Sequence, residues 1–122
     1  MVRTLGIAAI AVSMIVPAYA AGDATKGASV FPRCAICHSN VKGAGNRVGP
    51  NLFGVVGRAA GTAPGFSYST AMKSSGIAWT EDKLAAYVMH PAQVVPGNRM
   101  AFGGISSQSQ AQDLAAYLAT LK

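Results

Sequence analysis

Apolar positions recur at helical spacing in two stretches of the chain, and each stretch begins at a residue suited to capping a helix. Thr80 precedes Leu84, Tyr87 and Val88, whose three- and four-residue spacing predicts one face of a helix. Ser107 precedes the second stripe, which consists of Leu114, Tyr117, Leu118 and Leu121. No segment shows the alternation of apolar and polar residues that a half-buried strand would show. The sequence therefore predicts an all-α fold.

Shorter helical elements are predicted at two other places. Asp23 is suited to capping a first helix, which Pro32 should end or bend. Residues 69–75 form a candidate helical turn. Pro91 should stop the longer helix that begins after Thr80. Residues 92–106 lack a helical pattern and are expected to be irregular.

The first twenty residues have a pattern of their own. Arg3 precedes an almost unbroken apolar run over residues 5–16, and residues 18–20 (Ala-Tyr-Ala) provide a small-x-small cleavage site. This is the pattern of a secretory signal peptide. The apolar run is short for a bilayer span, which needs about 20 residues, so an uncleaved anchor is the less favoured alternative. We expect residues 1–20 to be cleaved and residues 21–122 to form one domain exported to a bacterial periplasm.

The charge of the chain narrows the class of partner. Removing Arg3 from the ten Lys and Arg residues leaves nine cations against four acidic residues, a formal charge of +5. A basic exported protein is attracted to acidic partners or membrane surfaces, although scattered charge more often serves solubility. The cations form no basic run, and export separates the protein from nucleic acid. We therefore expect no nucleic-acid partner and at most peripheral membrane contact.

The distinctive chemistry of the chain lies in residues 34–38, Cys-Ala-Ile-Cys-His. C-x-x-C-H is the attachment pattern of c-type haem, in which both thiols add to vinyl groups and the histidine is presented to iron. A thioredoxin-like pair would need a βαβ pattern, and a zinc site would need two more ligands, for which only His90 remains. A disulfide would close a very short, strained loop. We therefore predict one covalent haem on Cys34 and Cys37, with His38 as an iron ligand.

A long loop comes after this motif. Residues 39–65 contain seven glycines and two prolines and show little apolar periodicity. A compact domain tolerates such a stretch poorly unless something organises it, and a large flat cofactor can supply the missing packing surface. The haem is therefore predicted to be a structural element as well as a redox group.

The ligand on the opposite face of the iron decides what the haem can do. A methionine thioether raises the reduction potential and closes the iron for electron transfer. Met100 follows residues 96–97 (Pro-Gly) in an irregular loop, where a rigid turn can aim it. Met89 lies at a helix end, where apolar packing is its expected role. This reasoning does not decide whether Met72 is a candidate ligand. His90 is the main competitor because imidazole is the other common ligand, although it is also placed to cap a helix end.

Several sequence blocks accompany the C-x-x-C-H motif in a fixed order. They are Gly22-Asp23, Lys26-Gly27, Gly49-Pro50-Asn51-Leu52, Gly57-Arg58, Ala63-Pro64-Gly65-Phe66-Ser67-Tyr68, Gly76-Ile77-Ala78-Trp79, Pro96-Gly97-Asn98-Arg99-Met100 and Asp113-Leu114-Ala115-Ala116-Tyr117-Leu118. With these blocks the chain resembles class I cytochrome c, of the bacterial cytochrome c2 and mitochondrial type, over essentially all of residues 21–122. The resemblance implies the small cytochrome c fold, with three to five helices and long loops wrapped around one covalent haem.

The resemblance also implies roles for particular residues. Cys34 and Cys37 would form the thioethers, and His38 and Met100 would be the axial iron ligands. The Pro50 carbonyl would accept a hydrogen bond from His38. The contact between the first and last helices would be made by Gly27, Phe31, Leu114 and Tyr117.

Four more residues would surround the haem in this family. Tyr68 and Trp79 would reach the propionates, which Arg58 would help to neutralise. Tyr87 would lie beside the Met100 sulfur. Trp79 and Tyr87 could instead be core aromatics whose polar atoms find other partners.

Two departures from the family pattern bear on function. Arg99 stands where lysine commonly precedes the ligand methionine, and Asn98 stands where threonine is common. In the family that lysine can displace the methionine at high pH, whereas arginine resists deprotonation. We therefore expect an altered alkaline transition, measured as loss of the Met-to-iron absorption band in a pH titration.

Lysines around the haem edge are also fewer than the family usually has, which predicts weaker electrostatic steering of partners. The remaining candidate edge cations are Arg33, Lys42, Arg47 and Arg99.

These observations predict a monomeric periplasmic electron carrier with a single haem rather than an enzyme. The resemblance implies a quinol-cytochrome c oxidoreductase and a terminal oxidase as partners, and a periplasmic dehydrogenase is a further candidate. Two rival functions stay open. A labile Met100 would open the iron for peroxide reduction or gas binding, and tight association would make the chain a dedicated electron-acceptor subunit of a periplasmic dehydrogenase.

Overall fold

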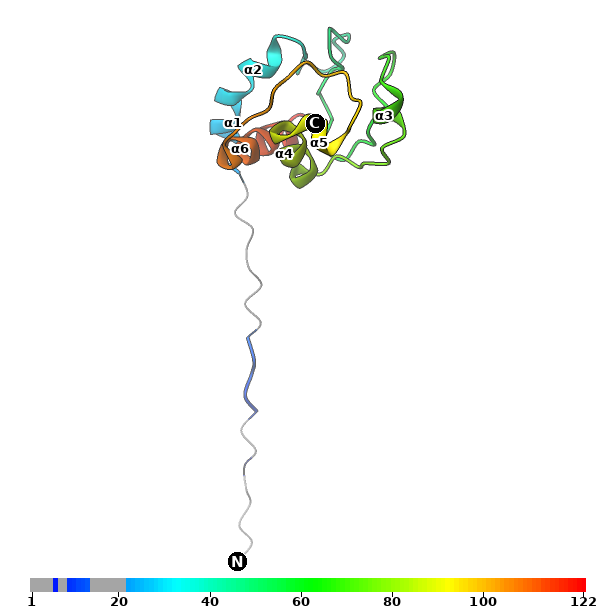
Figure 1. The fold of residues 1–122 in the computed structure, drawn as a ribbon. Coiled ribbons are helices and arrows are strands. Elements are labelled where there is room, and N and C mark those ends of the chain that lie inside the picture. The colour runs from blue at the N-terminus through cyan, green and yellow to red at the C-terminus, as the bar shows by residue number, and fades with distance from the viewer. Residues whose placement is uncertain (1–5, 7–8, 14–21) are drawn as a thin grey trace, which may run out of the picture.

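The structure is a computed structural model that describes residues 6, 9–13 and 22–122 (Figure 1). The predicted cleavage site at residues 18–20 lies outside the described residues, and the signal peptide stays a prediction. Within the described part of the chain, no helix is long and apolar enough to cross a membrane.

The described chain forms three longer helices and three helices of four residues. In chain order they are α1 (Ala24–Val30), α2 (Pro32–Ala35), α3 (Thr70–Lys73), α4 (Glu81–Met89), α5 (Pro91–Val94) and α6 (Gln108–Ala119). Over residues 22–122 there is no strand, only an isolated antiparallel bridge between Ala59 and Ala78. The predicted all-α class is confirmed.

Side-chain caps explain where the helices begin. Asp23 and Ser107, which precede α1 and α6, accept hydrogen bonds from the backbone N–H groups three residues ahead. Thr80 caps α4 in the same way, and Ser69 caps α3. Each cap satisfies an N–H group that has no partner within the helix. The starts predicted after Asp23, Thr80 and Ser107 are therefore confirmed.

Two prolines end one helix and begin another. Pro32 comes shortly after α1 and is the first residue of α2. Likewise, Pro91 comes shortly after α4 and is the first residue of α5. Proline is favoured at a first helical position because its φ is already helical and its missing N–H would have no partner there. The prediction of irregular backbone over residues 92–106 is therefore wrong at its start, where α5 lies.

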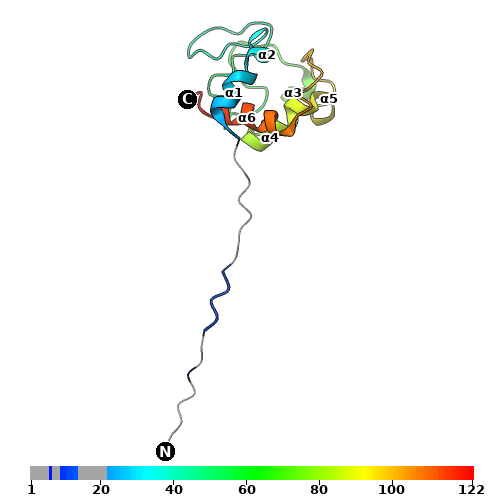
Figure 2. The same ribbon diagram turned by 90° about the vertical axis from the view of Figure 1, so that its left-hand side faces the viewer.

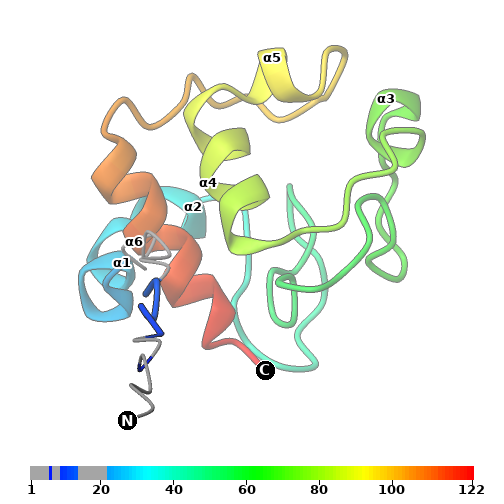
Figure 3. The same ribbon diagram turned by 90° about the horizontal axis from the view of Figure 1, so that it is seen from below.

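Helix α6 lies between α1 and α4, as the view in Figure 3 shows, and packs against both. Gly27 of α1 lies so close to α6 that an added Cβ would overlap the Asp113 backbone carbonyl. The Phe31 and Tyr117 rings lie 5.3 Å apart between centroids, and Leu114 is fully buried. The predicted contact between the first and last helices is confirmed.

Long loops cover the other side of this helical layer (Figures 1 and 2). No helix forms between α2 and α3, so the predicted long loop over residues 39–65 is present. Backbone hydrogen bonds fix it to the helical layer, with Gly54 N–H donating to Leu121 O and Gly57 N–H donating to Trp79 O, both at 2.7 Å. Of the predicted site residues, Pro50 and Arg58 lie in this loop, and Met100 lies in the segment after α5.

Candidate functional site

The C-x-x-C-H segment begins in α2 and ends in the turn after it. Cys34 lies in α2, and the N–H groups of Cys37 and His38 donate to its carbonyl at 3.0 and 2.9 Å. Both thiols are free and partly buried, so the disulfide alternative is absent from this structure. Burial raises the pKa of the Cys34 thiol, while the nearby Arg33 charge partly opposes that rise. The helix and the turn after it thus hold the two thiols close together in the chain.

His38 is fixed by the loop that comes after it. Its Nδ1 lies 2.7 Å from the Pro50 carbonyl oxygen, the hydrogen bond that the family resemblance implied. Because a carbonyl only accepts, Nδ1 carries the proton and donates, which leaves Nε2 with a free lone pair. Burial lowers the pKa of His38, the bond to Pro50 partly opposes that change, and the Arg58 charge lowers it further. The imidazole is therefore held neutral with one nitrogen free to bind a metal.

Gly49 leaves the space that the His38 ring occupies. An added Cβ at Gly49 would lie 2.6 Å from Nδ1 and 2.8 Å from Nε2 of that ring, and it would overlap Cε1. The Gly49 N–H donates to the Cys37 carbonyl at 2.9 Å, which ties this loop to the C-x-x-C-H turn. Glycine is required here because no other side chain lets the backbone approach the imidazole so closely.

The loop that carries Met100 is clamped by the side chain of Asn98. Its Nδ2 donates to the Pro91 and Val95 carbonyls at 3.0 and 2.9 Å, and its Oδ1 accepts from the Met100 N–H at 2.9 Å. The turn before it needs Gly97, whose φ is +86°. One amide therefore ties the backbone at Met100 to both ends of α5. We identified Asn98 in the sequence only as a departure from threonine and missed this role.

The same loop is fixed again beyond Met100. Ile105 is fully buried and its N–H donates to the Val88 carbonyl of α4 at 2.8 Å. Among the competing ligands, Met72 is buried on α3 and His90 is exposed as the C-cap of α4, the capping position expected for it. Met100 is half-buried and packs against the core. The structure thus places Met100 in a loop held at both sides.

The predicted aromatic residues belong to one apolar cluster. Trp79 and Tyr87 are buried with ring centroids 5.1 Å apart, and Cys34, Tyr68 and Met100 pack against the cluster that contains them. Burial raises the pKa of the Tyr87 hydroxyl to about 12. The structure therefore brings a thiol of the C-x-x-C-H turn, the Met100 thioether and the aromatic side chains to one core.

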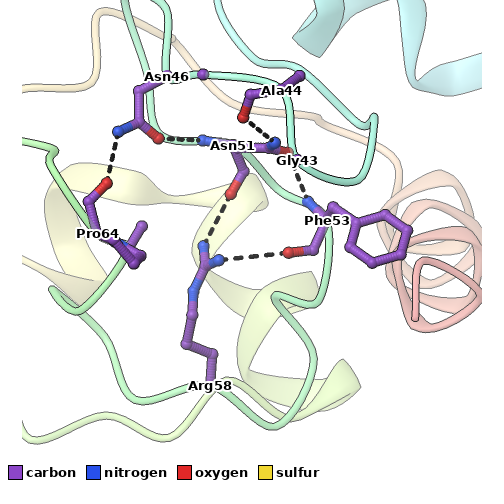
Figure 4. Close-up of a pocket in the computed structure, with 9 residues that line it drawn as sticks. Gly43, Ala44, Asn46, Asn51, Phe53, Arg58 and Pro64 are labelled. Atoms are coloured by element: carbon purple, nitrogen blue, oxygen red, sulfur yellow. Dashed lines mark hydrogen bonds between the residues drawn. The ribbon is translucent and has the colours of Figure 1, made fainter.

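Arg58 and Tyr68 are bonded within the long loop. Arg58 donates to the Asn51 carbonyl at 3.1 Å and to the Phe53 carbonyl at 3.5 Å (Figure 4), and burial lowers its pKa. The Tyr68 hydroxyl accepts from the Ala63 N–H at 3.0 Å. Both side chains stabilise loop backbone, whatever else they bind.

A cavity of about 300 Å³ lies beside Arg58 (Figure 4). Its lining is residues 43–46, Asn51, Phe53, Arg58, Ala63 and Pro64. Asn46 bridges two parts of this lining, since its Nδ2 donates to Pro64 O at 2.8 Å and its Oδ1 accepts from Asn51 N–H at 2.9 Å. Arg58 is the single member of the predicted site set in this lining, which includes neither His38 nor Met100. Sequence reasoning missed Asn46, although an Asn in a loop rich in Gly often bonds to backbone.

The alternatives to haem lack support in the described residues. No group of three His, Cys, Asp or Glu side chains there is placed to hold a metal ion, which removes the basis for a zinc site. The absence of strands over residues 22–122 removes the βαβ context of a thioredoxin-like pair.

The residues present fit a c-type haem. Two free thiols and a neutral imidazole lie on one turn, and the glycine opposite gives the imidazole its space. The thioether lies on a clamped loop against an aromatic core. When bound, the haem would be held by Cys34, Cys37, His38 and Met100.

Comparison with known proteins identifies the family. The Cytochrome c family model matches residues 24–122. Cytochrome c of Stellaria longipes is 47% identical over 98 residues, which cover 80% of this chain and 91% of that protein. Cytochrome c2 of Blastochloris viridis is 46% identical over 99 residues, which cover 81% of this chain and 78% of that protein.

A solved structure gives the same result. Cytochrome cH from Methylobacterium extorquens matches with a TM-score of 0.76 and 42% sequence identity, covering 81% of this chain and 99% of that one. The chain therefore belongs to the cytochrome c family, and both the resemblance and the class I fold inferred from the sequence are confirmed. Membership of this family implies haem c as cofactor and electron transport as the general function.

Proposed function

We propose that this cytochrome is a periplasmic electron carrier with one haem, attached through thioethers to Cys34 and Cys37 and ligated by His38 and Met100. The observation that carries the proposal is the hydrogen bond from His38 Nδ1 to the Pro50 carbonyl. It fixes the tautomer in which Nε2 has a free lone pair for a metal, in a chain that offers two free thiols on the same short segment.

The protein's part in electron transfer is to hold its ligands still. Haem iron supplies a one-electron ferric/ferrous couple when bound. The Pro50 carbonyl orients the His38 ring, and Asn98 holds the backbone of Met100. Fixed ligands limit rearrangement on electron transfer, and the surrounding apolar core favours the reduced state because that state carries less charge. No residue in this account makes or breaks a substrate bond, so the chain acts as a carrier and not as an enzyme.

The proposed periplasmic location, and the redox partners found there, require that the protein be exported. The signal-peptide pattern in residues 1–20 supports export, and two of the similar proteins are bacterial cytochromes. The donor and acceptor would be redox proteins such as a quinol-cytochrome c oxidoreductase, a terminal oxidase or a periplasmic dehydrogenase. A monomer that associates briefly with each suits a shuttle, because small interfaces dissociate quickly.

The first test is the absorption spectrum of the purified haem protein in its oxidised and reduced forms. His/Met ligation predicts a weak charge-transfer band near roughly 695 nm in the ferric state and no spectral change when CO is added to the ferrous state. Met100→Ala should abolish the band and admit CO, whereas Met72→Leu should do neither. A wild-type protein that lacks the band and binds CO would contradict His/Met ligation and favour an open iron.

A further inference from the structure

The cavity beside Arg58 combines apolar walls with one charge (Figure 4). Phe53, Ala63 and Pro64 supply apolar surface, and residues 43–46 close another side with three small residues and Asn46. Its volume of about 300 Å³ lies at the lower end of the range for small-molecule sites, which are mostly apolar with a few polar groups. The cavity therefore has the size and the lining of a site for a small ligand.

Hydrogen bonds hold the walls of this cavity together. The Asn46 amide joins the Asn51 N–H to the Pro64 carbonyl. Asn51 Nδ2 donates to the Ala44 carbonyl at 2.8 Å, and its Oδ1 accepts from the Phe53 N–H at 2.9 Å. Because these walls are already bonded to one another, a ligand that enters loses little free energy in ordering them.

The charge in the cavity is the half-buried guanidinium of Arg58. Two of its five N–H donors bond to loop carbonyls, which leaves three for other acceptors. The sequence has no acidic residue between Asp23 and Glu81, and within the described chain no carboxylate is among the groups that shift the pKa of Arg58. A partly buried cation without a carboxylate partner favours the binding of an anion.

The cavity differs from the set of residues that would hold the haem. Its lining includes none of the two thiols and two axial ligands proposed for the haem, and it includes neither Tyr68 nor Trp79. Arg58 is the one residue common to this lining and to the set expected near the propionates. A molecule in the cavity would thus bind beside the haem site without occupying the positions of its ligands.

We propose that this cavity binds a small monocarboxylate with an aromatic body, whose carboxylate bonds to Arg58 and whose body lies against Phe53 and Pro64. A planar guanidinium pairs with a carboxylate through two parallel hydrogen bonds. Among the described residues that line the cavity there is no second cation, so inorganic phosphate would keep an unbalanced charge there and would leave the apolar walls unused. An aromatic acid of about nine heavy atoms should bind with a Kd of about 1 mM.

Binding at Arg58 should also depend on the redox state, and this step rests on the proposed electron-carrier function. The oxidised protein carries one more positive charge than the reduced protein, so it attracts a carboxylate more strongly. We expect the oxidised protein to bind the ligand about threefold more tightly. By linkage, saturating ligand should lower the reduction potential by about 28 mV, since about 59 mV corresponds to a factor of ten for one electron.

The first test titrates the haem protein, in its reduced form and at constant ionic strength, with sodium benzoate and follows the backbone amide signals by NMR. Signals of residues 43–46, Phe53 and Ala63 should shift and saturate. Benzamide, which has the same shape without the charge, should bind at least tenfold more weakly, and inorganic phosphate should cause no saturable shift. Binding of benzamide or of phosphate as tight as that of benzoate would overturn the assignment to an aromatic carboxylate.

Two variants test the cavity and keep the guanidinium. Ala44 and Gly45 both line the cavity, and an added Cβ at Gly45 would meet no atom within 4 Å, so a larger side chain there takes up open space. Ala44→Leu and Gly45→Leu should each weaken benzoate binding about tenfold, because the leucine occupies space that the ligand needs. Ala28→Leu, at an exposed position of α1, should bind benzoate as wild type does. Wild-type affinity in both cavity variants would overturn the location of the site.

The charge is tested by Arg58→Gln, which should abolish saturable binding of benzoate. Unchanged binding by this variant would overturn the role of Arg58. The two leucine variants accompany it because Arg58→Gln also removes the charge expected near the propionates.

Voltammetry separates this proposal from the proposed function. A reversible ferric/ferrous couple in a wild type that does not bind benzoate would overturn the cavity site and leave the carrier function standing. A potential that stays constant while benzoate binds would overturn the redox linkage. Loss of the reversible couple in wild type would overturn the carrier function, and the amide shifts would still decide whether the cavity binds benzoate.

Discussion

Asn98 uses one amide to bond three backbone groups, and so it ties the Met100 loop to α5. Its Nδ2 bonds to the Pro91 and Val95 carbonyls, and its Oδ1 bonds to the Met100 N–H. Each such bond contributes on the order of 1 kcal/mol, and losing one leaves a partner unsatisfied. Removing the amide should therefore raise the population of loop conformations in which Met100 is out of place.

We predict that Asn98→Ala speeds the displacement of Met100 by added imidazole in the ferric protein. Imidazole can bind only when the loop opens, so the rate at which the Met-to-iron band is lost reports loop opening. We expect this rate to increase about tenfold when the Asn98 amide is removed. Asn98→Asp keeps the acceptor for the Met100 N–H but loses both donors, so its rate should be intermediate. Gln93→Ala, an exposed change in α5, is the control. Equal rates in wild type and Asn98→Ala would show that the clamp does not limit opening.

Tyr87 gives the protein a pH dependence on the alkaline side. Its hydroxyl has an ordinary pKa of 10, which burial raises to about 12 in the folded protein. The unfolded chain therefore releases this proton at lower pH than the folded protein does. By linkage, the contribution of Tyr87 to stability is complete below pH 10 and is lost as the pH rises from 10 to 12.

The corresponding prediction compares wild type with Tyr87→Phe. The difference in free energy of unfolding between them should stay constant below pH 10 and should shift in favour of Tyr87→Phe between pH 10 and 12. Urea titrations at several pH values measure it, and groups common to both proteins cancel in the difference. A difference that does not change with pH would mean that the hydroxyl is as well solvated in the folded protein as in the unfolded chain.

From the residue pattern alone, the candidate site could be predicted only where chemistry fixes a spacing, and the partner of His38, Pro50, came from the family resemblance. C-x-x-C-H identifies Cys34, Cys37 and His38 because two thiols and an imidazole must reach one porphyrin. Asn46 and Asn98 bond to backbone carbonyls and N–H groups that only the tertiary structure brings near them. No periodic pattern in the sequence identifies such partners, so the hydrogen bonds of the two asparagines could be found only in the structure.

At the scale of helices, the starts were predictable and the short proline-led helices were not. A capping side chain acts on an N–H group three residues away, so Thr80 and Ser107 signal their helices locally. The α2 and α5 helices have four residues each, too few for an apolar period to show. They form because Pro32 and Pro91 set the first helical φ and the preceding helix supplies an anchor.

The close contact of α1 with α6 is possible because Gly27 has no side chain. Gly27→Ala would normally stabilise a helix by about 0.5–1 kcal/mol. Here the new Cβ would overlap the Asp113 carbonyl and lie 2.7 Å from the Tyr117 Cβ, so α1 would have to move away from α6. We predict a net loss of about 2–3 kcal/mol, the cost of overpacking a closely packed contact.

Urea unfolding of the haem protein measures this change. Ser29→Ala, at an exposed position in the same helix, is the matched control and should be neutral or slightly stabilising because alanine favours helix. If Gly27→Ala were as stable as Ser29→Ala, the two helices would not depend on close backbone contact. The loss of stability expected for Gly27→Ala and not for Ser29→Ala separates packing from helix propensity.

Across the whole molecule, the helical layer and the long loop differ in how they are held. Helix α6 packs against both α1 and α4, and its apolar residues are among the most buried in the protein. The loop between α2 and α3 buries only three apolar side chains, those of Val55, Ala60 and Ala63, and is fixed mainly by scattered backbone bonds such as Gly54 N–H to Leu121 O. A chain with so little apolar packing over this stretch needs a further surface to fold against.

This difference between layer and loop predicts how the chain should behave when haem attachment is prevented. The double variant Cys34→Ser/Cys37→Ser should retain part of its helical circular dichroism, because α1 and α6 contact each other directly. Amide protons over residues 39–68 should lose their protection from exchange, and unfolding should lose cooperativity. Ile36→Ser changes the same motif without removing a thiol and should behave as wild type. Full protection of residues 39–68 in the double variant would show that the loop folds on the helices alone. The cofactor would then be bound by a finished fold and would not help to complete it.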